Sequence, residues 1–116
     1  MASGRNEGAM IKVLAVLHRR ADMSREEFVR YWREVHAPLA RGMEGVRRYV
    51  INPTLEAFAM GEPPFDGLAE LWFDDAAAAR AAFGSAAGRA TTEDLVNFTQ
   101  AERTQVVIAE EIAIVS

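Results

Sequence analysis

The two histidines, His18 and His36, are the side chains of this chain best suited to proton transfer near neutral pH, because an imidazole has an ordinary pKa of about 6.5. His36 ends an apolar helical pattern and is followed by Pro38. A neutral histidine can take up a proton, and its protonated form can return one. His36 is therefore the candidate general acid or base. An imidazole in this place can equally close a helix end by bonding to backbone carbonyls, and the sequence leaves both interpretations open.

Candidate walls for a binding site come from two segments that carry large side chains. The first segment repeats apolar residues at helical spacing, and the second is a predicted strand in which an acid and an indole share one face. Aromatic stripes of this kind are more often core than ligand site, and a carboxylate among apolar neighbours can be paired, solvated or raised in pKa. The candidate substrate-binding residues are Phe28, Tyr31, Trp32, Glu70 and Trp72.

Several kinds of site have no support in the sequence. The chain has no cysteine, and two histidines without an H-E-x-x-H pattern do not make a zinc site, so we predict no metal. No glycine-rich phosphate loop is present, and we predict no cofactor. The net charge is -4 and the arginine pairs are interleaved with acids, which argues against a nucleic acid partner.

The location of the protein is predicted from similar absences. No apolar run approaches the roughly 20 residues that cross a bilayer, so no membrane partner is expected. Residues 1–9 lack the apolar region of a secretory signal and are predicted to be a disordered lead. We therefore expect a cytoplasmic protein with one domain over residues 10–116.

The elements that position the candidate residues alternate along the chain. Strands are predicted over 10–18, 46–52, 68–73 and 103–115, the last of them bent near 110–111. The first helix begins at Ser24, which forms a capping box with Glu27, and its inward stripe runs from Phe28 to Val35. This helix should loosen before Pro38 and leave His36 in a loop at its C-terminus. A second helix is predicted after residues 74–75. Past a short linker, a third helix is predicted to begin at residue 91, which would form a capping pair with residue 94. Residues 54–64 are predicted to form a loop, with a short strand possible near 56–59.

The order β-α-β-β-α-β predicts an α+β fold, the ferredoxin-like antiparallel sheet with its helices on one face. The other face of the sheet also carries Val, Leu, Ile and Trp, so it should need a second sheet. The expected assembly is a homodimer, a dimeric α+β barrel.

With these residues in place, the chain resembles the EthD family of dimeric α+β barrel proteins. The resemblance is carried by KVLAVLHRR, SREEFVRYWREVHAPLA, DGLAELWFDD and AFGSAAGRATTEDLVNF, and it spans about residues 10–115. Its most specific part is the pattern F-x-x-Y-W-x-x-x-H-A-P-L. The resemblance implies a small-molecule enzyme, since similar domains are labelled oxidoreductases or act as decarboxylases and dehydratases. In the related methylmuconolactone methylisomerases a histidine and a tyrosine line the pocket at positions equivalent to His36 and Tyr49. This resemblance implies that His36 and Tyr49 are the candidate catalytic pair, with the Tyr49 hydroxyl orienting the substrate or donating to a developing oxyanion. The same isomerases also use a cysteine, which this chain lacks.

Three functions remain open at this point. The first is a cofactor-independent enzyme that acts on a small, apolar, oxygenated metabolite. The second is a non-catalytic barrel that binds a hydrophobic metabolite or supports a partner enzyme. The third is a haem-handling protein, for which only His18 or His36 could supply an axial ligand.

Overall fold

Four strands form one antiparallel sheet in a computed structural model that describes residues 10–59 and 61–116. The strands are β2 (Ile11–Leu17), β3 (Arg48–Pro53), β4 (Gly67–Phe73) and β5 (Gln105–Glu110), and their spatial order is β3-β4-β2-β5. This is the strand order of a ferredoxin-like sheet, and the predicted fold class is confirmed. The lead predicted at residues 1–9 lies outside the described residues.

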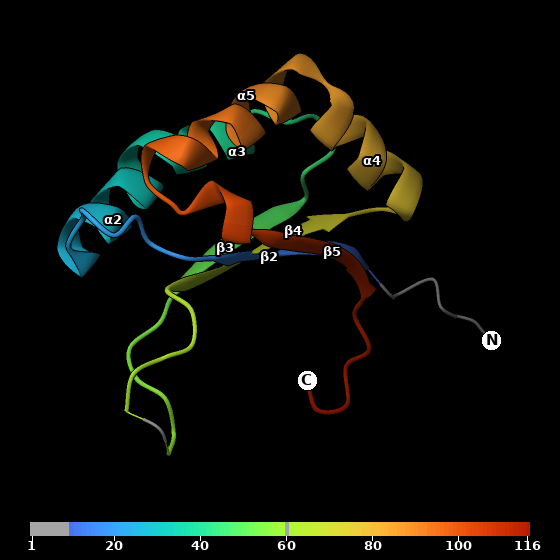
Figure 1. The fold of residues 1–116 in the computed structure, drawn as a ribbon. Coiled ribbons are helices and arrows are strands. Elements are labelled where there is room, and N and C mark those ends of the chain that lie inside the picture. The colour runs from blue at the N-terminus through green and yellow to red at the C-terminus, as the bar shows by residue number, and fades with distance from the viewer. Residues whose placement is uncertain (1–9, 60) are drawn as a thin grey trace.

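The helices lie together on one face of the sheet (Figure 1). They are α2 (Arg25–Tyr31), a π-helical segment (Trp32–His36), α3 (Ala37–Arg41), α4 (Ala76–Gly84) and α5 (Ala86–Asp94), followed by short 3₁₀ turns at Leu95–Asn97 and Ala101–Arg103. None of the helices in the described part of the chain is long and apolar enough to cross a membrane.

Strand alternation divides the sheet into two faces as predicted. Val13 pairs with Leu71, and both are buried beneath the helices. Leu14 pairs with Glu70, and Glu70 pairs in turn with Val50, on the opposite face. We call this helix-free side the outer face; it contains Lys12, Leu14, Val16, Arg48, Val50, Leu68, Glu70 and Trp72.

The first helix begins where the sequence predicts. The backbone N–H of Glu27 donates to the Ser24 hydroxyl at 3.1 Å, and the Ser24 N–H donates to the Glu27 carboxylate at 2.8 Å. This reciprocal cap satisfies two helix N–H groups that would otherwise lack a partner. It fixes the start of the helix that carries His36.

The predicted break before Pro38 is wrong. The chain widens into a π-helical turn at Trp32–His36 and continues directly into α3. The Ala37 N–H donates to the Trp32 carbonyl, five residues back, so the hydrogen-bond pattern shifts by one residue before the proline, which has no N–H to donate. His36 therefore lies inside a continuous helix, not in a loop at a helix C-terminus.

The same turn changes which residues face inward. In an unbroken α-helix that buries Phe28 and Trp32, Val35 would be the next inward residue. Here Val35 is 45% exposed, and His36 is buried instead. The extra residue in the π turn thus moves the inward stripe from Val35 to His36, and the predicted inward position of Val35 is wrong.

The last helix starts earlier than predicted. Ser85 caps α5, since its hydroxyl accepts from the Gly88 N–H at 3.1 Å. Thr91 lies within the helix and Asp94 is its final residue, so their predicted roles in a cap are wrong. Gly88 permits the tight turn between α4 and α5, because an added Cβ would lie 2.2 Å from the Ala82 carbonyl oxygen. The earlier start of α5 and this tight turn bring Asp94 into contact with His36 of the first helix.

The strand predicted over 103–115 is shorter, Gln105–Glu110. Its partner β2 begins at Ile11, which pairs with Glu110, so residues beyond 111 have no strand to pair with. In the described part of the 54–64 loop, the short strand thought possible near 56–59 is reduced to an isolated bridge between Ala57 and Gly61. Figure 1 shows this loop and the C-terminal segment extending past the sheet on the side away from the helices.

Candidate functional site

A cavity of about 410 Å³ lies between the inner face of the sheet and the helices. This size is at the lower end of the range of small-molecule sites, about 300–1,000 Å³. Its wall is mostly apolar and comes from all four strands of the sheet together with the helices. The residues that line it include Val13, Ala15, Leu17, Trp32, His36, Ala40, Met43, Tyr49, Leu71, Ala79, Arg80, Phe83, Thr91, Thr92, Leu95, Thr104 and Val106–Ile108.

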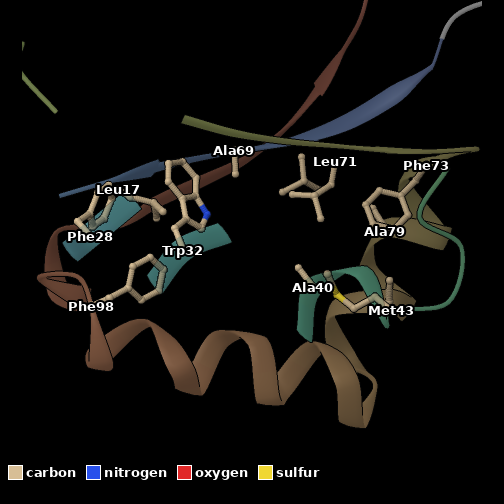
Figure 2. Close-up of a cluster of buried hydrophobic side chains, with 12 residues drawn as sticks. Leu17, Phe28, Trp32, Ala40, Met43, Ala69, Leu71, Phe73, Ala79 and Phe98 are labelled. Atoms are coloured by element: carbon tan, nitrogen blue, oxygen red, sulfur yellow. The ribbon is translucent and has the colours of Figure 1, made fainter. Parts of the chain in front are cut away.

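The buried side chains fall into two groups (Figure 2). Leu17, Phe28, Trp32 and Phe98 gather at one end of the helix layer, and Ala40, Met43, Leu71, Phe73 and Ala79 gather at the other. Members of both groups line the cavity. The cavity therefore occupies the space between two packed regions of the core.

His36 lines this cavity and forms a buried pair with Asp94, which lies behind it and is not a lining residue. The Nδ1 atom of His36 lies 2.9 Å from the Asp94 carboxylate oxygen Oδ2, although the two residues are 58 positions apart. Their side chains are 6% and 10% exposed. Because Nδ1 is engaged by the carboxylate and no hydrogen bond of Nε2 joins it to another described residue, Nε2 is the ring nitrogen left for a ligand.

Asp94 is held in place by two further donors. The Tyr31 hydroxyl donates to Oδ1 at 2.7 Å, and the Asn97 side-chain amide donates to the same oxygen at 2.9 Å. The carboxylate therefore accepts from Tyr31, Asn97 and His36 at once. Such charge-assisted hydrogen bonds fix both the position and the ionised form of a buried acid.

The pKa shifts of this group agree with its geometry. Burial lowers the pKa of His36 below 6.5, and the nearby Asp94 carboxylate only partly offsets that effect. Burial opposes ionisation of Asp94, but the hydrogen bonds from Tyr31, Asn97 and His36 together hold its pKa below its usual 3.8. At neutral pH the pair is thus a carboxylate and a neutral imidazole, with the proton on Nδ1 and a lone pair on Nε2.

Phe98 fixes the plane of the imidazole. Its ring centroid is 4.7 Å from that of His36, 5.1 Å from that of Tyr31 and 5.6 Å from that of Phe28. Phe98 is fully buried. One aromatic side chain from the end of the last helical region therefore packs the first helix and orients its histidine.

Tyr49 and Trp32 line the same cavity as His36. Burial raises the pKa of Tyr49 to about 12, so its hydroxyl stays protonated and can act only as a neutral donor or acceptor near pH 7. The indole of Trp32 covers Gly67, where an added Cβ would lie 2.4 Å from the ring. Three of the predicted site residues are thus brought to one cavity.

The remaining predicted site residues lie elsewhere. Phe28 is fully buried in the core beside the cavity, and Tyr31 acts on Asp94. Glu70 and Trp72 lie on the outer face, because the alternation of β4 directs Ala69 and Leu71 to the inner one. Their predicted place in the same pocket as His36 is therefore wrong.

Glu70 and Trp72 belong to a charged cluster on the outer face. The Glu70 carboxylate pairs with Lys12 Nζ at 3.0 Å, and this hydrogen bond lowers the pKa of Glu70. Lys12 and Arg48 lie 5.0 and 4.6 Å from the Trp72 ring, at cation–π distance. A paired carboxylate of this kind does not have the raised pKa that a buried general acid would need.

No local sequence pattern signals the role of Asp94 or Asn97. Their three-residue spacing at the end of a helix is typical of local capping, and only the fold brings them to His36. His18, the other histidine, lies just after β2 and is not among the residues lining the cavity. Among residues 10–59 and 61–116, no cluster of three or more potential ligands could hold a metal ion.

Solved structures with the same fold support this description. An ethyl tert-butyl ether D (EthD) family protein from Bacillus halodurans superposes with a TM-score of 0.78 at 26% identity, covering 89% of this chain and 99% of its own. An EthD-like protein from Ralstonia eutropha JMP134 gives a TM-score of 0.67 at 21% identity over 92% and 94% of the two chains. A protein from Bacteroides fragilis described as dimeric and ferredoxin-like gives 0.65 at 12% identity over 88% and 96%.

Curated proteins provide no match to this chain. The family model of the EthD domain, in contrast, matches residues 20–102, which span the capped helix, His36, Tyr49 and Asp94. Since this match covers well over half of the sequence, the chain belongs to the EthD family.

Proposed function

We propose that the protein binds a small, mostly apolar, oxygenated metabolite in this cavity and converts it by proton transfer at His36, without a cofactor. The observation that supports the proposal most directly is that His36 lines an apolar cavity while its Nδ1 is paired with the buried carboxylate of Asp94. A neutral imidazole whose Nδ1–H is fixed by a carboxylate presents the Nε2 lone pair to a bound molecule.

The chemistry follows from these groups. Nε2 takes a proton from an acidic C–H or O–H of the substrate, and the electron pair moves onto the substrate oxygen. Tyr49, which remains protonated because burial raises its pKa to about 12, is the candidate donor to that oxygen. The proton then returns from the imidazolium to another atom of the substrate, which is an isomerisation, or to a leaving group, which is an elimination.

Asp94 is a positioning residue in this scheme. Its carboxylate selects the Nδ1–H tautomer and stabilises the imidazolium that forms during transfer. Tyr31 and Asn97 keep the carboxylate ionised and aligned. General base catalysis of this kind contributes about 10²–10⁴-fold to a rate.

A substrate screen with three proteins tests the proposal. Pools of aromatic and alicyclic acids, lactones and ketones are incubated with the wild type, His36→Ala and His18→Ala, and conversion is followed by mass spectrometry. We expect conversion by the wild type and by His18→Ala, and loss of at least about 100-fold in His36→Ala. Equal conversion by all three proteins would refute the acid–base role; binding of a pool member without conversion would instead favour the non-catalytic binding function.

We also propose that the protein acts as a homodimer that pairs through the outer face. No helix covers this face (Figure 1), and it carries Leu14, Val16 and Val50. The loop and the tail that extend past it expose further apolar side chains, which are Leu55 (82% exposed), Phe58, Ile112, Ile114 and Val115. Exposed apolar surface of this extent is typical of an interface.

Light scattering after size-exclusion chromatography measures the mass of the assembly in solution directly. The wild type is expected at twice the mass of the chain, and Val16→Lys, which places a charge on the outer face, at the mass of one chain. A monomeric wild type would refute the dimer.

A further inference from the structure

The cavity has a buried end and an open end, and their chemistry differs. At the buried end, His36 and Leu71 are each about 5% exposed or less. At the open end, between β5 and the helices α4 and α5, the inward-facing Val106 and Ile108 are 53% and 41% exposed. A bound molecule therefore enters along β5 and reaches His36 with its inner end.

Because His36 is neutral at neutral pH, Arg80 is the one charged side chain among the residues that line this cavity. It projects from α4, is exposed, and forms no salt bridge or hydrogen bond with any other residue that the structure describes. The protein as a whole carries a net charge of -4, and Arg80 gives the rim of this apolar cavity a local positive charge. A guanidinium there attracts anions and pairs well with a carboxylate.

Thr104 supplies a second, independent observation in the same wall. Its hydroxyl is buried and has no hydrogen-bond partner among the described residues, and Thr104 immediately precedes β5. Buried hydroxyls are almost always paired, since leaving one unpaired is unfavourable. The other wall threonines are satisfied within the protein, as Thr91 and Thr92 donate to helix carbonyls.

We propose that the substrate is an apolar carboxylate, with its anionic group held at the open end by Arg80 and with a hydrogen bond to Thr104. The apolar body then fills the cavity, and the carbon that exchanges a proton lies at His36. This inference rests on the proposed function in one respect, since it takes the cavity to be the substrate site.

Paired probes that differ only in charge test this inference. The probes are 4-isopropylbenzoate and the uncharged 4-isopropylbenzamide, which have the same shape and the same apolar body. Binding is measured by calorimetry, and by tryptophan fluorescence in a Trp72→Phe background. Since the sequence has two tryptophans, this background leaves Trp32, in the cavity wall, as the single reporter.

We expect the benzoate to bind about tenfold more tightly than the benzamide, the lower end of what one charge-assisted hydrogen bond provides. Arg80→Gln should remove this preference and leave benzamide affinity unchanged. Arg41→Gln, which removes an exposed arginine outside the cavity, should keep the preference. Thr104→Val should weaken benzoate binding about fivefold without lowering the melting temperature, because the unbound protein loses only an unpaired hydroxyl.

The outcomes that overturn the inference are distinct from those that overturn the proposed function. Equal binding of the two probes, unaffected by Arg80→Gln, would refute the carboxylate substrate and leave the cavity as a binding site for neutral molecules. Absence of binding by both probes would refute the inference and the binding role of the cavity together. Loss of activity in His36→Ala is a separate result that neither outcome affects.

Discussion

Replacing Asp94 with asparagine should move the proton of His36 from one ring nitrogen to the other. In the wild type, the two carboxylate oxygens accept from His36 Nδ1, from the Tyr31 hydroxyl and from the Asn97 amide. An asparagine side chain offers one oxygen and one NH₂ group. The oxygen satisfies two donors if it faces Tyr31 and Asn97, and only one if it faces His36. The NH₂ group should therefore face Nδ1, which must become an acceptor, and the proton moves to Nε2.

The effect on stability follows from the same count. Three hydrogen bonds change from charge-assisted to neutral, and each such change removes about 1 kcal/mol. The total of about 3 kcal/mol corresponds to a fall of about 12 °C in melting temperature for a domain of this size. Activity should fall by at least about 100-fold, because Nε2 now carries a proton and cannot accept one.

Nitrogen-15 spectra of histidine-labelled protein at pH 7.5 measure the tautomer without knowledge of the substrate. We expect an Nδ1–H signal for His36 in the wild type and an Nε2–H signal in Asp94→Asn, with His18 as an internal reference. Glu93→Gln is the matched control, because it removes the adjacent, exposed acid from the same helix. An unchanged Nδ1–H tautomer in Asp94→Asn would refute this description of the site, and so would a melting temperature within 3 °C of the wild type.

Three further predictions address the rest of the fold. Burial lowers the pKa of His36 below the 6.5 of the unfolded chain, so the unfolded state binds more protons below pH 6.5. The contribution of neutral His36 to the free energy of unfolding should therefore be fully present above pH 6.5 and should be lost as the pH falls from 6.5 toward the folded pKa. Thermal melts between pH 7.5 and 5 should show this loss in the wild type and in His18→Gln but not in His36→Gln. Gly88→Ala should lower the free energy of unfolding by about 3 kcal/mol in urea titrations, because the added Cβ would lie 2.2 Å from a carbonyl oxygen. Gly84→Ala is the control: its Cβ would enter open space, so the free energy of unfolding should be unchanged or slightly higher. Glu70→Gln should cost at most about 1 kcal/mol as one member of a partly exposed ion pair, and affinity for 4-isopropylbenzoate should not change; a tenfold loss of affinity would mean that the outer face takes part in binding.

The sequence predicted those parts of the fold that depend on local pattern. The alternation of β4 assigned Leu71 and Glu70 to opposite faces, and the structure confirms it because a pleated strand allows no other arrangement. The cap at Ser24 was predicted for a similar reason, since all its partners lie within four residues. His36 and Tyr49 were selected by residue type and resemblance, and the fold places both in one cavity.

What escaped prediction depends on contacts between distant segments. The end of β5 is set by where β2 begins, about a hundred residues earlier in the chain, and not by its own apolar residues. Ser85 and Thr91 are both good capping residues, and the packing of α4 against α5 decides between them. Asp94 meets His36 across 58 residues, and no local spacing encodes that distance.

The π-helical turn at Trp32–His36 has a consequence for how this helix can change during evolution. Deleting one exposed residue from it, such as Glu34, would restore ordinary α-helical hydrogen bonding and improve the local helix. The same deletion would keep the histidine inward, because it would then stand seven residues after Phe28, the position that faces inward in an unbroken α-helix. Closing the π turn without a deletion would instead turn Val35 inward and move His36 away from the cavity. The π turn and its extra residue must therefore be gained or lost together for the chain to keep a proton acceptor in the cavity wall.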